Sequence, residues 1–185
     1  MRRKYKYINQ KKNNCFPTCL QMILERNNIK GYNQDKIASF FERNEEGFIR
    51  IKDINKQFFL PNKINLKEIF FPFKEIEMTG MDNIKDRFDN SNNDYMLFTN
   101  LATLTSTKEE LEELRRKDDE KLYINHCFLI EGIKDENNVI LVCPETAGKG
   151  GTEFIVVTLD QIYQSMDRVV HNAGFGISEI SKLKY

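Results

Sequence analysis

Helix-forming patterns come first in this sequence and strand-forming patterns follow, and this order restricts the fold more than any other feature. Apolar residues at helical spacing predict early helices at 16–26, 33–41 and 51–59. Extended patterns predict later strands at 64–77, 95–101, 122–133, 139–143 and 153–158. A short helix is predicted at 82–88 and a last one at 159–166, before a strand-like tail. Segregated helices and strands indicate an α+β fold in which a helical lobe faces a sheet lobe.

A strongly charged segment, residues 106–121, interrupts the strand-rich half. Ser106 or Thr107 can cap it as a helix, and Leu111 and Leu114 are its only strong apolar residues, so it can bury a narrow stripe. We therefore expect one domain, 1–185, with a charged helical insertion at about 105–121. The insertion is either a solvated helix or an arm that binds a protein partner.

Charge and hydropathy exclude several classes of function. The 28 basic and 28 acidic residues cancel, which argues against nucleic acid as a partner. No run of eighteen apolar residues is present, so we expect no membrane insertion, and the basic N-terminus lacks the apolar stretch of a signal peptide. Four cysteines in a chain of this length do not suggest a disulfide scaffold. A cytoplasmic protein with reduced thiols is the expectation.

The stretch QKKNNCFPTCLQMIL, residues 10–24, places Cys15 at the start of the first predicted helix. Unpaired N–H groups and the helix dipole favour a thiolate at such a position. A thiolate nucleophile needs a base, and the sequence has two histidines, His126 and His171. His126 is the better candidate because it begins a predicted strand, where its ring would project from a rigid element.

Three segments resemble the papain-like cysteine peptidases, and within them the C39 and C39-like families: QKKNNCFPTCLQMIL (10–24), HCFLIEGI (126–133) and NVILVCPETAG (138–148). The resemblance implies a papain-like fold, with a helical N-terminal lobe packed against an antiparallel sheet lobe. It also implies a peptide or protein substrate and neither cofactor nor metal. Carried over residue by residue, it makes Cys15 the nucleophile, His126 the base and Gln10 a contributor to the oxyanion hole.

Two positions depart from the family pattern. Gln10 precedes Cys15 by five residues, where the family has six. More importantly, Cys143-Pro144 stands where the family has an aspartate followed by proline, and a thiol orients an imidazole less well than a carboxylate does. Glu145, two residues further on, is the first candidate to replace the aspartate, and a backbone carbonyl is the second.

Three alternatives remain at this point. A catalytically silent binding module could keep the fold without the carboxylate. An acyltransferase or deamidase could use the same Cys-His site. Finally, Cys15, Cys19, His126 and Cys143 could hold a structural zinc ion, although the first two lie within one apolar helix.

Overall fold

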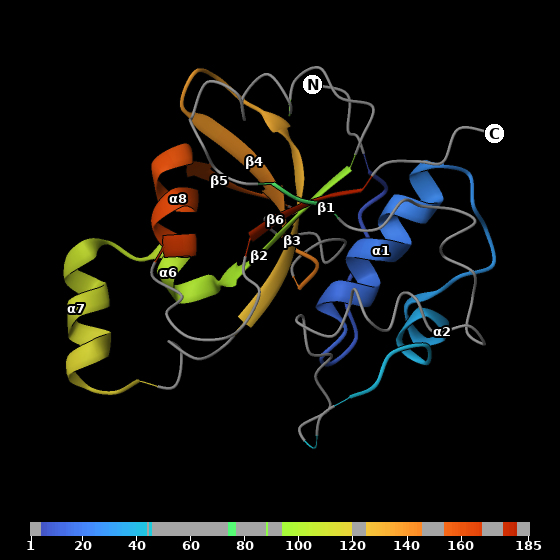
Figure 1. Cartoon of the computed structure of the whole chain (residues 1–185), viewed down its shortest axis with the longest axis horizontal. Helices are drawn as coiled ribbons and strands as arrows, with labels where there is room; N and C mark the ends of the chain where they lie inside the picture. Colours follow the sequence, from blue (N-terminus) through green and yellow to red (C-terminus); the bar gives the residue numbers. More distant parts are fainter. Residues whose placement is uncertain are drawn as a thin grey trace.

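A six-stranded antiparallel sheet forms the centre of the computed structural model, which describes residues 5–43, 45, 74–76, 88, 94–119, 125–145, 154–167 and 176–180. The strand order across the sheet is β1-β6-β2-β3-β4-β5 (Figure 1). The strands are β1 (Lys74–Ile76), β2 (Asp94–Asn100), β3 (Asn125–Ile133), β4 (Asn138–Val142), β5 (Phe154–Thr158) and β6 (Gly176–Ile180). The last strand that the structure describes therefore lies between β1 and β2, next to the edge strand.

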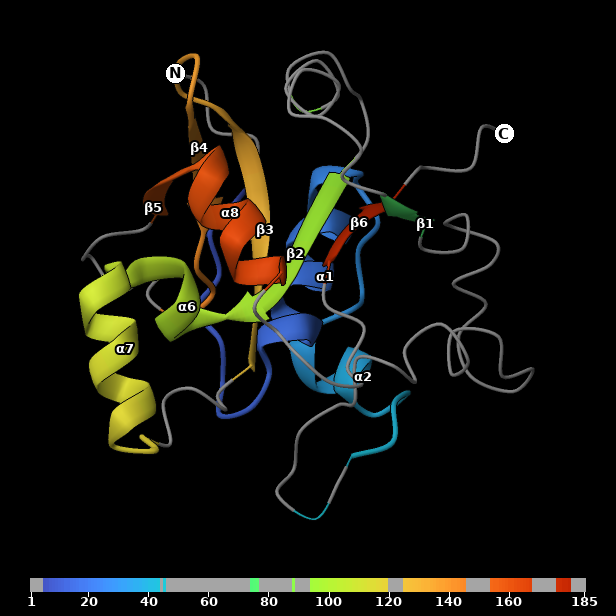
Figure 2. The same ribbon diagram turned by 60° about the vertical axis from the view of Figure 1, so that its left-hand side comes forward.

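Helices cover both faces of this sheet (Figures 1 and 2). They are α1 (Cys15–Arg26), α2 (Gln34–Ala38), α6 (Leu101–Thr105), α7 (Lys108–Arg116) and α8 (Leu159–Asp167). α1 and α2 lie on one side, and α6 and α8 lie on the other. The α+β class is confirmed, and the later helices α6 and α8 lie on the face of the sheet opposite α1 and α2.

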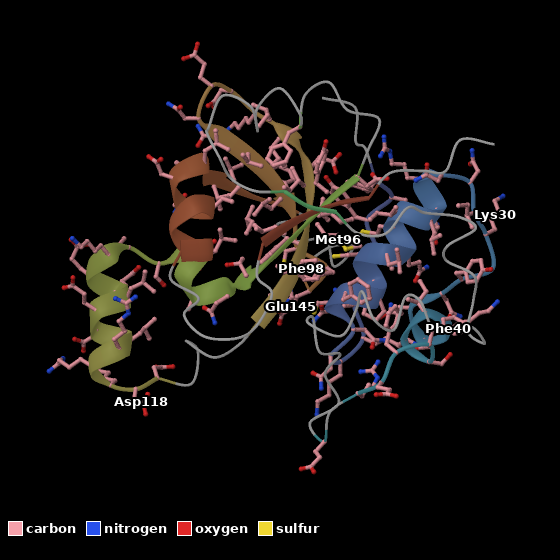
Figure 3. The ribbon with its side chains drawn as sticks, viewed as in Figure 1. Lys30, Phe40, Met96, Phe98, Asp118 and Glu145 are labelled. Atoms are coloured by element: carbon pink, nitrogen blue, oxygen red, sulfur yellow. The ribbon has the colours of Figure 1, made fainter. Side chains whose placement is uncertain are left out.

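Successive residues of β3 point to opposite faces, and this alternation builds two separate cores. Cys127 and Leu129 pack with Leu20 and Ile23 of α1 and with Met96 and Phe98 of β2. The two β2 side chains face α1 in Figure 3. Phe128 and Ile130 instead pack with Leu104 of α6 and Ile162 of α8. We call these the α1 face and the α8 face of the sheet.

A buried carboxylate ties the α1 face together away from the site. Asp94, at the start of β2, accepts a hydrogen bond of 2.7 Å from the Tyr5 hydroxyl. It also forms an ion pair with Arg26, the last residue of α1. The pKa of the Tyr5 hydroxyl is raised well above its usual value, first by burial and then by the neighbouring Asp94 charge. The C-terminal end of α1 is thereby fixed against β2.

The charged insertion forms α7, which is shorter than the predicted 106–121 segment. Thr107 caps it, accepting from the Glu110 N–H, while the Glu110 carboxylate accepts from the Thr107 N–H. Leu111 is its buried residue, as the narrow apolar stripe predicted. None of the helices in the described part of the chain is both long enough and apolar enough to cross a membrane.

Most other sequence predictions can be compared with the structure. The helices predicted at 16–26, 33–41 and 159–166 correspond to α1, α2 and α8, and the hairpin of β3 and β4 is antiparallel as expected. Helix α6 was not predicted. The helix predicted at 51–59, most of that at 82–88 and the first part of the extended segment 64–77 lie outside the described residues.

Candidate active site

Cys15 is the first residue of α1, where the helix leaves its N–H groups unpaired. Pro17 stands two residues later, in the first turn, where a missing N–H costs no helical hydrogen bond. Asn14 precedes the helix, and its side chain does not cap it. Because no acidic residue lies in the first turn, no carboxylate there opposes a negative charge on the sulfur.

The loop that leads to Cys15 is held by one buried side chain, Gln34. Its Oε1 accepts hydrogen bonds from the Lys11 N–H (2.7 Å), the Thr18 hydroxyl (3.0 Å) and the Asn14 amide (3.3 Å). Its Nε2 donates to the Asn9 carbonyl at 3.0 Å. Sequence reasoning missed Gln34, because a glutamine at the start of a short helix carries no signal of contacts made twenty residues upstream.

The Cys15 thiol is a poor acid in this structure. Burial raises its pKa to about 12, although the backbone groups of Cys127, Phe16 and Cys15 itself act in the opposite direction. Backbone N–H groups near a thiolate favour the charged form and so lower the pKa of the thiol. The expected helix-start effect is therefore present, but the cost of burying a thiolate outweighs it.

The His126 ring lies at the start of β3 on the α8 face. Its Nε2 is 3.5 Å from the Cys143 sulfur, which is hydrogen-bond distance for sulfur, and its ring packs edge-on against Phe128 at 4.6 Å between centroids. Burial lowers the pKa of this imidazole to about 4. At neutral pH the histidine is uncharged, and so is the Cys15 thiol.

Cys143, not Glu145, is thus the group that meets the ring nitrogen. The sequence favoured Glu145, but Cys143, which follows β4 and packs with Phe128 on the α8 face, is the residue whose sulfur lies 3.5 Å from the His126 Nε2. Glu145 is exposed, and its carboxylate lies within 4.8 Å of the other two ligand atoms.

The starts of α1 and β3 lie at the same end of the sheet in both ribbon views (Figures 1 and 2), and Figure 3 places Glu145 at that end. Cys15 packs against the α1-face core, whereas His126 contacts residues of the α8-face core. Among the described contacts, no hydrogen bond joins the Cys15 sulfur to the His126 ring. The backbone of Cys127, the residue after His126, is nevertheless close enough to Cys15 to lower the pKa of its thiol.

Gln10 lies beside the end of β4. Its backbone N–H donates to the Pro144 carbonyl at 2.7 Å, and the neighbouring Asn9 amide donates to the Glu145 carbonyl at 2.6 Å. The Gln10 Oε1 atom is buried and makes no hydrogen bond within the described part of the protein. The loop before Cys15 and the segment after Cys143 are therefore clamped to each other.

One group of described side chains is compact enough to hold a metal ion: His126, Cys143 and Glu145. It includes neither Cys15 nor Cys19, so the four-ligand zinc set considered from the sequence is wrong. Those two cysteines belong to the α1 face, and Cys19 is buried with its sulfur 3.4 Å from the Cys127 carbonyl oxygen. His171 lies outside the described residues.

The crystal structure of a "putative C39-like peptidase" from Bacillus anthracis superposes on this chain with a TM-score of 0.62. The two chains share a fold. The match covers 100% of each chain, while 13% of the aligned residues are identical, so the likeness concerns the fold alone. The sequence matches no family model and none of the curated proteins.

Proposed function

We propose that this protein is a cysteine peptidase or a related thiol acyl hydrolase with a papain-like arrangement. Cys15 is the nucleophile, His126 the base, and the carbonyl of a peptide or protein the electrophile. The observation that carries this proposal is the position of Cys15, which begins α1 and lies close enough to the backbone of Cys127, the residue after His126, for that backbone to lower the pKa of its thiol. The shared fold with a C39-like structure agrees with it.

The two nitrogens of the His126 ring have different roles in this proposal. Because Nε2 lies against Cys143, Nδ1 is the nitrogen left for the proton of Cys15. For Nδ1 to accept, Nε2 must carry the ring hydrogen and donate it to the Cys143 sulfur. Cys143 then selects the tautomer as the family aspartate would, but a thiol stabilises the imidazolium less than a carboxylate does.

The oxyanion of the tetrahedral intermediate would be held at the start of α1. The Cys15 N–H is one donor, and the Gln10 side-chain amide is the second. Gln10 is suited to this role because its backbone is fixed by the Pro144 carbonyl while its side-chain oxygen has no described partner to hold it elsewhere.

The resting pair is a thiol and a neutral imidazole, since the pKa of Cys15 is about 12 and that of His126 about 4. Proton transfer must therefore accompany attack on the substrate rather than precede it. Burial is the main cause of both shifts, so polar groups of a bound peptide beside the half-buried Cys15 would reduce the barrier. We expect a substrate-dependent nucleophile.

The same two pKa values favour one alternative, a binding module that keeps the fold without catalysis. A neutral pair with no carboxylate on the ring nitrogen is the state expected of such a module. The two functions differ in how Cys15 responds to an electrophile shaped like a peptide.

Labelling with a peptidyl electrophile, such as a peptidyl chloromethyl ketone, tests the proposal. We expect Cys15 to be modified much faster by the peptidyl reagent than by iodoacetamide, after each rate is divided by that for free cysteine. Cys15→Ala should abolish the labelling and any hydrolysis of a mixed peptide library. Cys19→Ala, which removes a buried thiol from the same helix, is the matched control and should retain both. Equal normalised rates with the two reagents, and no hydrolysis, would establish the binding module instead.

A further inference from the structure

Three different metal-binding side chains meet at the end of β4, and the peptidase mechanism uses only one of them as a reacting group. The imidazole of His126, the thiol of Cys143 and the carboxylate of Glu145 have ligand atoms within 4.8 Å of one another. Nitrogen, sulfur and oxygen donors in this combination suit zinc and related divalent transition metals.

The sulfur-to-nitrogen distance agrees with a tetrahedral site. Zinc–sulfur and zinc–nitrogen bonds of about 2.3 and 2.05 Å at a tetrahedral angle put the two ligand atoms roughly 3.5–3.6 Å apart. The Cys143 sulfur and the His126 Nε2 are 3.5 Å apart. Two of the ligands therefore already have the separation that the metal requires. The exposed carboxylate of Glu145 can become the third ligand by a rotamer change.

The backbone that carries these ligands is fixed from outside. Pro144 joins Cys143 to Glu145, and its carbonyl accepts from the Gln10 N–H at 2.7 Å and from the Asn9 amide at 3.3 Å. The Glu145 carbonyl accepts from the same Asn9 amide at 2.6 Å. Such support keeps the ligands close together without the metal, which lowers the cost of binding it. The exposed Glu145 also gives the ion a route in from solvent.

We propose that His126, Cys143 and Glu145 form a site for Zn²⁺ or a similar divalent transition metal, and that the bound metal inhibits the Cys15 chemistry. Binding deprotonates the Cys143 thiol, so one proton is released to solvent as the metal–sulfur bond forms. The metal occupies Nε2 of His126, and the neutral ring must then carry its hydrogen on Nδ1. A ring in that form cannot accept the proton of Cys15. The inhibitory half of this inference rests on the proposed function, whereas the metal site does not.

Metal binding is tested first, on the purified full chain after treatment with a chelator and under reducing conditions. Competition with a chromophoric zinc indicator should show one Zn²⁺ per chain, and Co²⁺ should give a thiolate-to-cobalt charge-transfer band. Cys143→Ala and Glu145→Gln should each weaken binding at least tenfold, since even supporting residues of metal sites affect affinity by about 10–100-fold.

Two matched controls use the same residue types away from the cluster. Cys19→Ala removes another buried thiol, and Glu136→Gln removes an exposed carboxylate of the β3–β4 turn. Both should bind zinc as the wild type does. Unchanged binding in Cys143→Ala, or an equal loss in Cys19→Ala, would overturn the site.

Inhibition is tested with the hydrolysis or peptidyl-labelling assay. Zn²⁺ should slow the wild type, a chelator should restore it, and Glu145→Gln should need a higher metal concentration by the same factor as its loss of affinity. The same inhibitory concentration in both proteins would mean that zinc acts on Cys15, and hydrolysis that requires zinc but not Cys15 would also overturn the inference. If zinc binds through these residues while Cys15 proves dispensable, the proposed function fails and the metal site stands. If Cys15 is required while zinc does not bind, the metal site fails and the proposed function stands.

Discussion

The two faces of the sheet are assembled from the sequence in different ways. On the α1 face, Cys15, the loop before it and the side chain that holds this loop all lie within residues 9–34, and the hydrogen bonds of Gln34 connect the loop to α1. On the α8 face, His126 meets Cys143 from the next strand, and Thr99 of β2 donates to the Ser165 carbonyl of α8. Cys15 is thus positioned by a local unit, and His126 by contacts between strands.

The same comparison applies to charge. Burial raises the pKa of Cys15 and lowers that of His126, so both groups are held neutral, on opposite faces of one sheet. In the proposed mechanism, Cys15 and His126 exchange a proton at the end of the sheet, where the two faces meet. Substitutions at three residues, His126, Cys15 and Gln34, test how far the two faces act separately. The largest expected effect comes first.

His126→Ala should have the largest effect on turnover. Removing a general base costs roughly 10²–10⁴-fold in rate, so kcat/KM for a peptide substrate should fall within that range. The control is Thr99→Val, which changes the cross-strand neighbour of His126 and removes the hydrogen bond to Ser165. It should cost about 1 kcal/mol of stability and only a few-fold in turnover. Equal losses of turnover in the two variants would mean that His126 is a packing residue.

Acid stability should separate the two faces next. The folded protein binds a proton at His126 only near pH 4, whereas the unfolded chain does so near 6.5, so stability is complete above pH 6.5 and is lost as pH falls toward 4. The shift of about 2.5 pKa units corresponds to roughly 3 kcal/mol. Urea unfolding at pH 7 and at pH 4 should show a smaller loss in His126→Asn than in the wild type, by up to that amount.

The corresponding change on the α1 face should occur at alkaline pH. The unfolded thiol loses its proton near pH 9 and the folded Cys15 near 12, so stability falls as pH rises above 9. Cys15→Ala should reduce the alkaline loss and leave the acid loss as it is in the wild type. A change in the acid limb would show that the two groups titrate together.

Among the substitutions at these three residues, Gln34→Ala should have the smallest effect. It removes the acceptor shared by the Lys11 N–H and the Thr18 hydroxyl, at a cost of about 2 kcal/mol. As a positioning residue, Gln34 should also affect kcat, and Gln34→Glu should restore part of it because a carboxylate keeps the acceptor oxygen. Asn33→Ala is the control, since it removes the cap of α2, which accepts from the Lys36 N–H, without touching the loop. If Asn33→Ala lowers kcat equally, the effect is one of stability.

Local patterns explain what could be predicted from the sequence. Pro17 and the apolar spacing after Cys15 define α1, Asn33 caps α2, and Thr107 caps α7. These features depend on residues a few positions apart. The β3–β4 hairpin is also a local feature, because a short turn joins its two strands.

What could not be predicted depends on distant contacts. The pattern gave Cys15 an activating helix start, but it could not show that burial would outweigh the N–H groups. Glu145 was favoured over Cys143 on chemical grounds, whereas the fold places the Cys143 sulfur against the ring nitrogen. The position of β6 between β1 and β2 is not indicated by the sequence of any one of these three strands.

That position of β6 affects how the protein is made. β6 (Gly176–Ile180), which pairs with both β1 and β2, is synthesised long after α1. Until then, β1 and β2 lack the strand that joins them. At translation rates of about 5–20 residues per second, the interval between α1 and β6 is roughly ten to thirty seconds. During that time the sheet against which α1 packs is incomplete, so the thiols of Cys19 and Cys127, which the finished fold buries, are open to oxidants. Newly made chains should therefore be more sensitive to oxidation than mature ones.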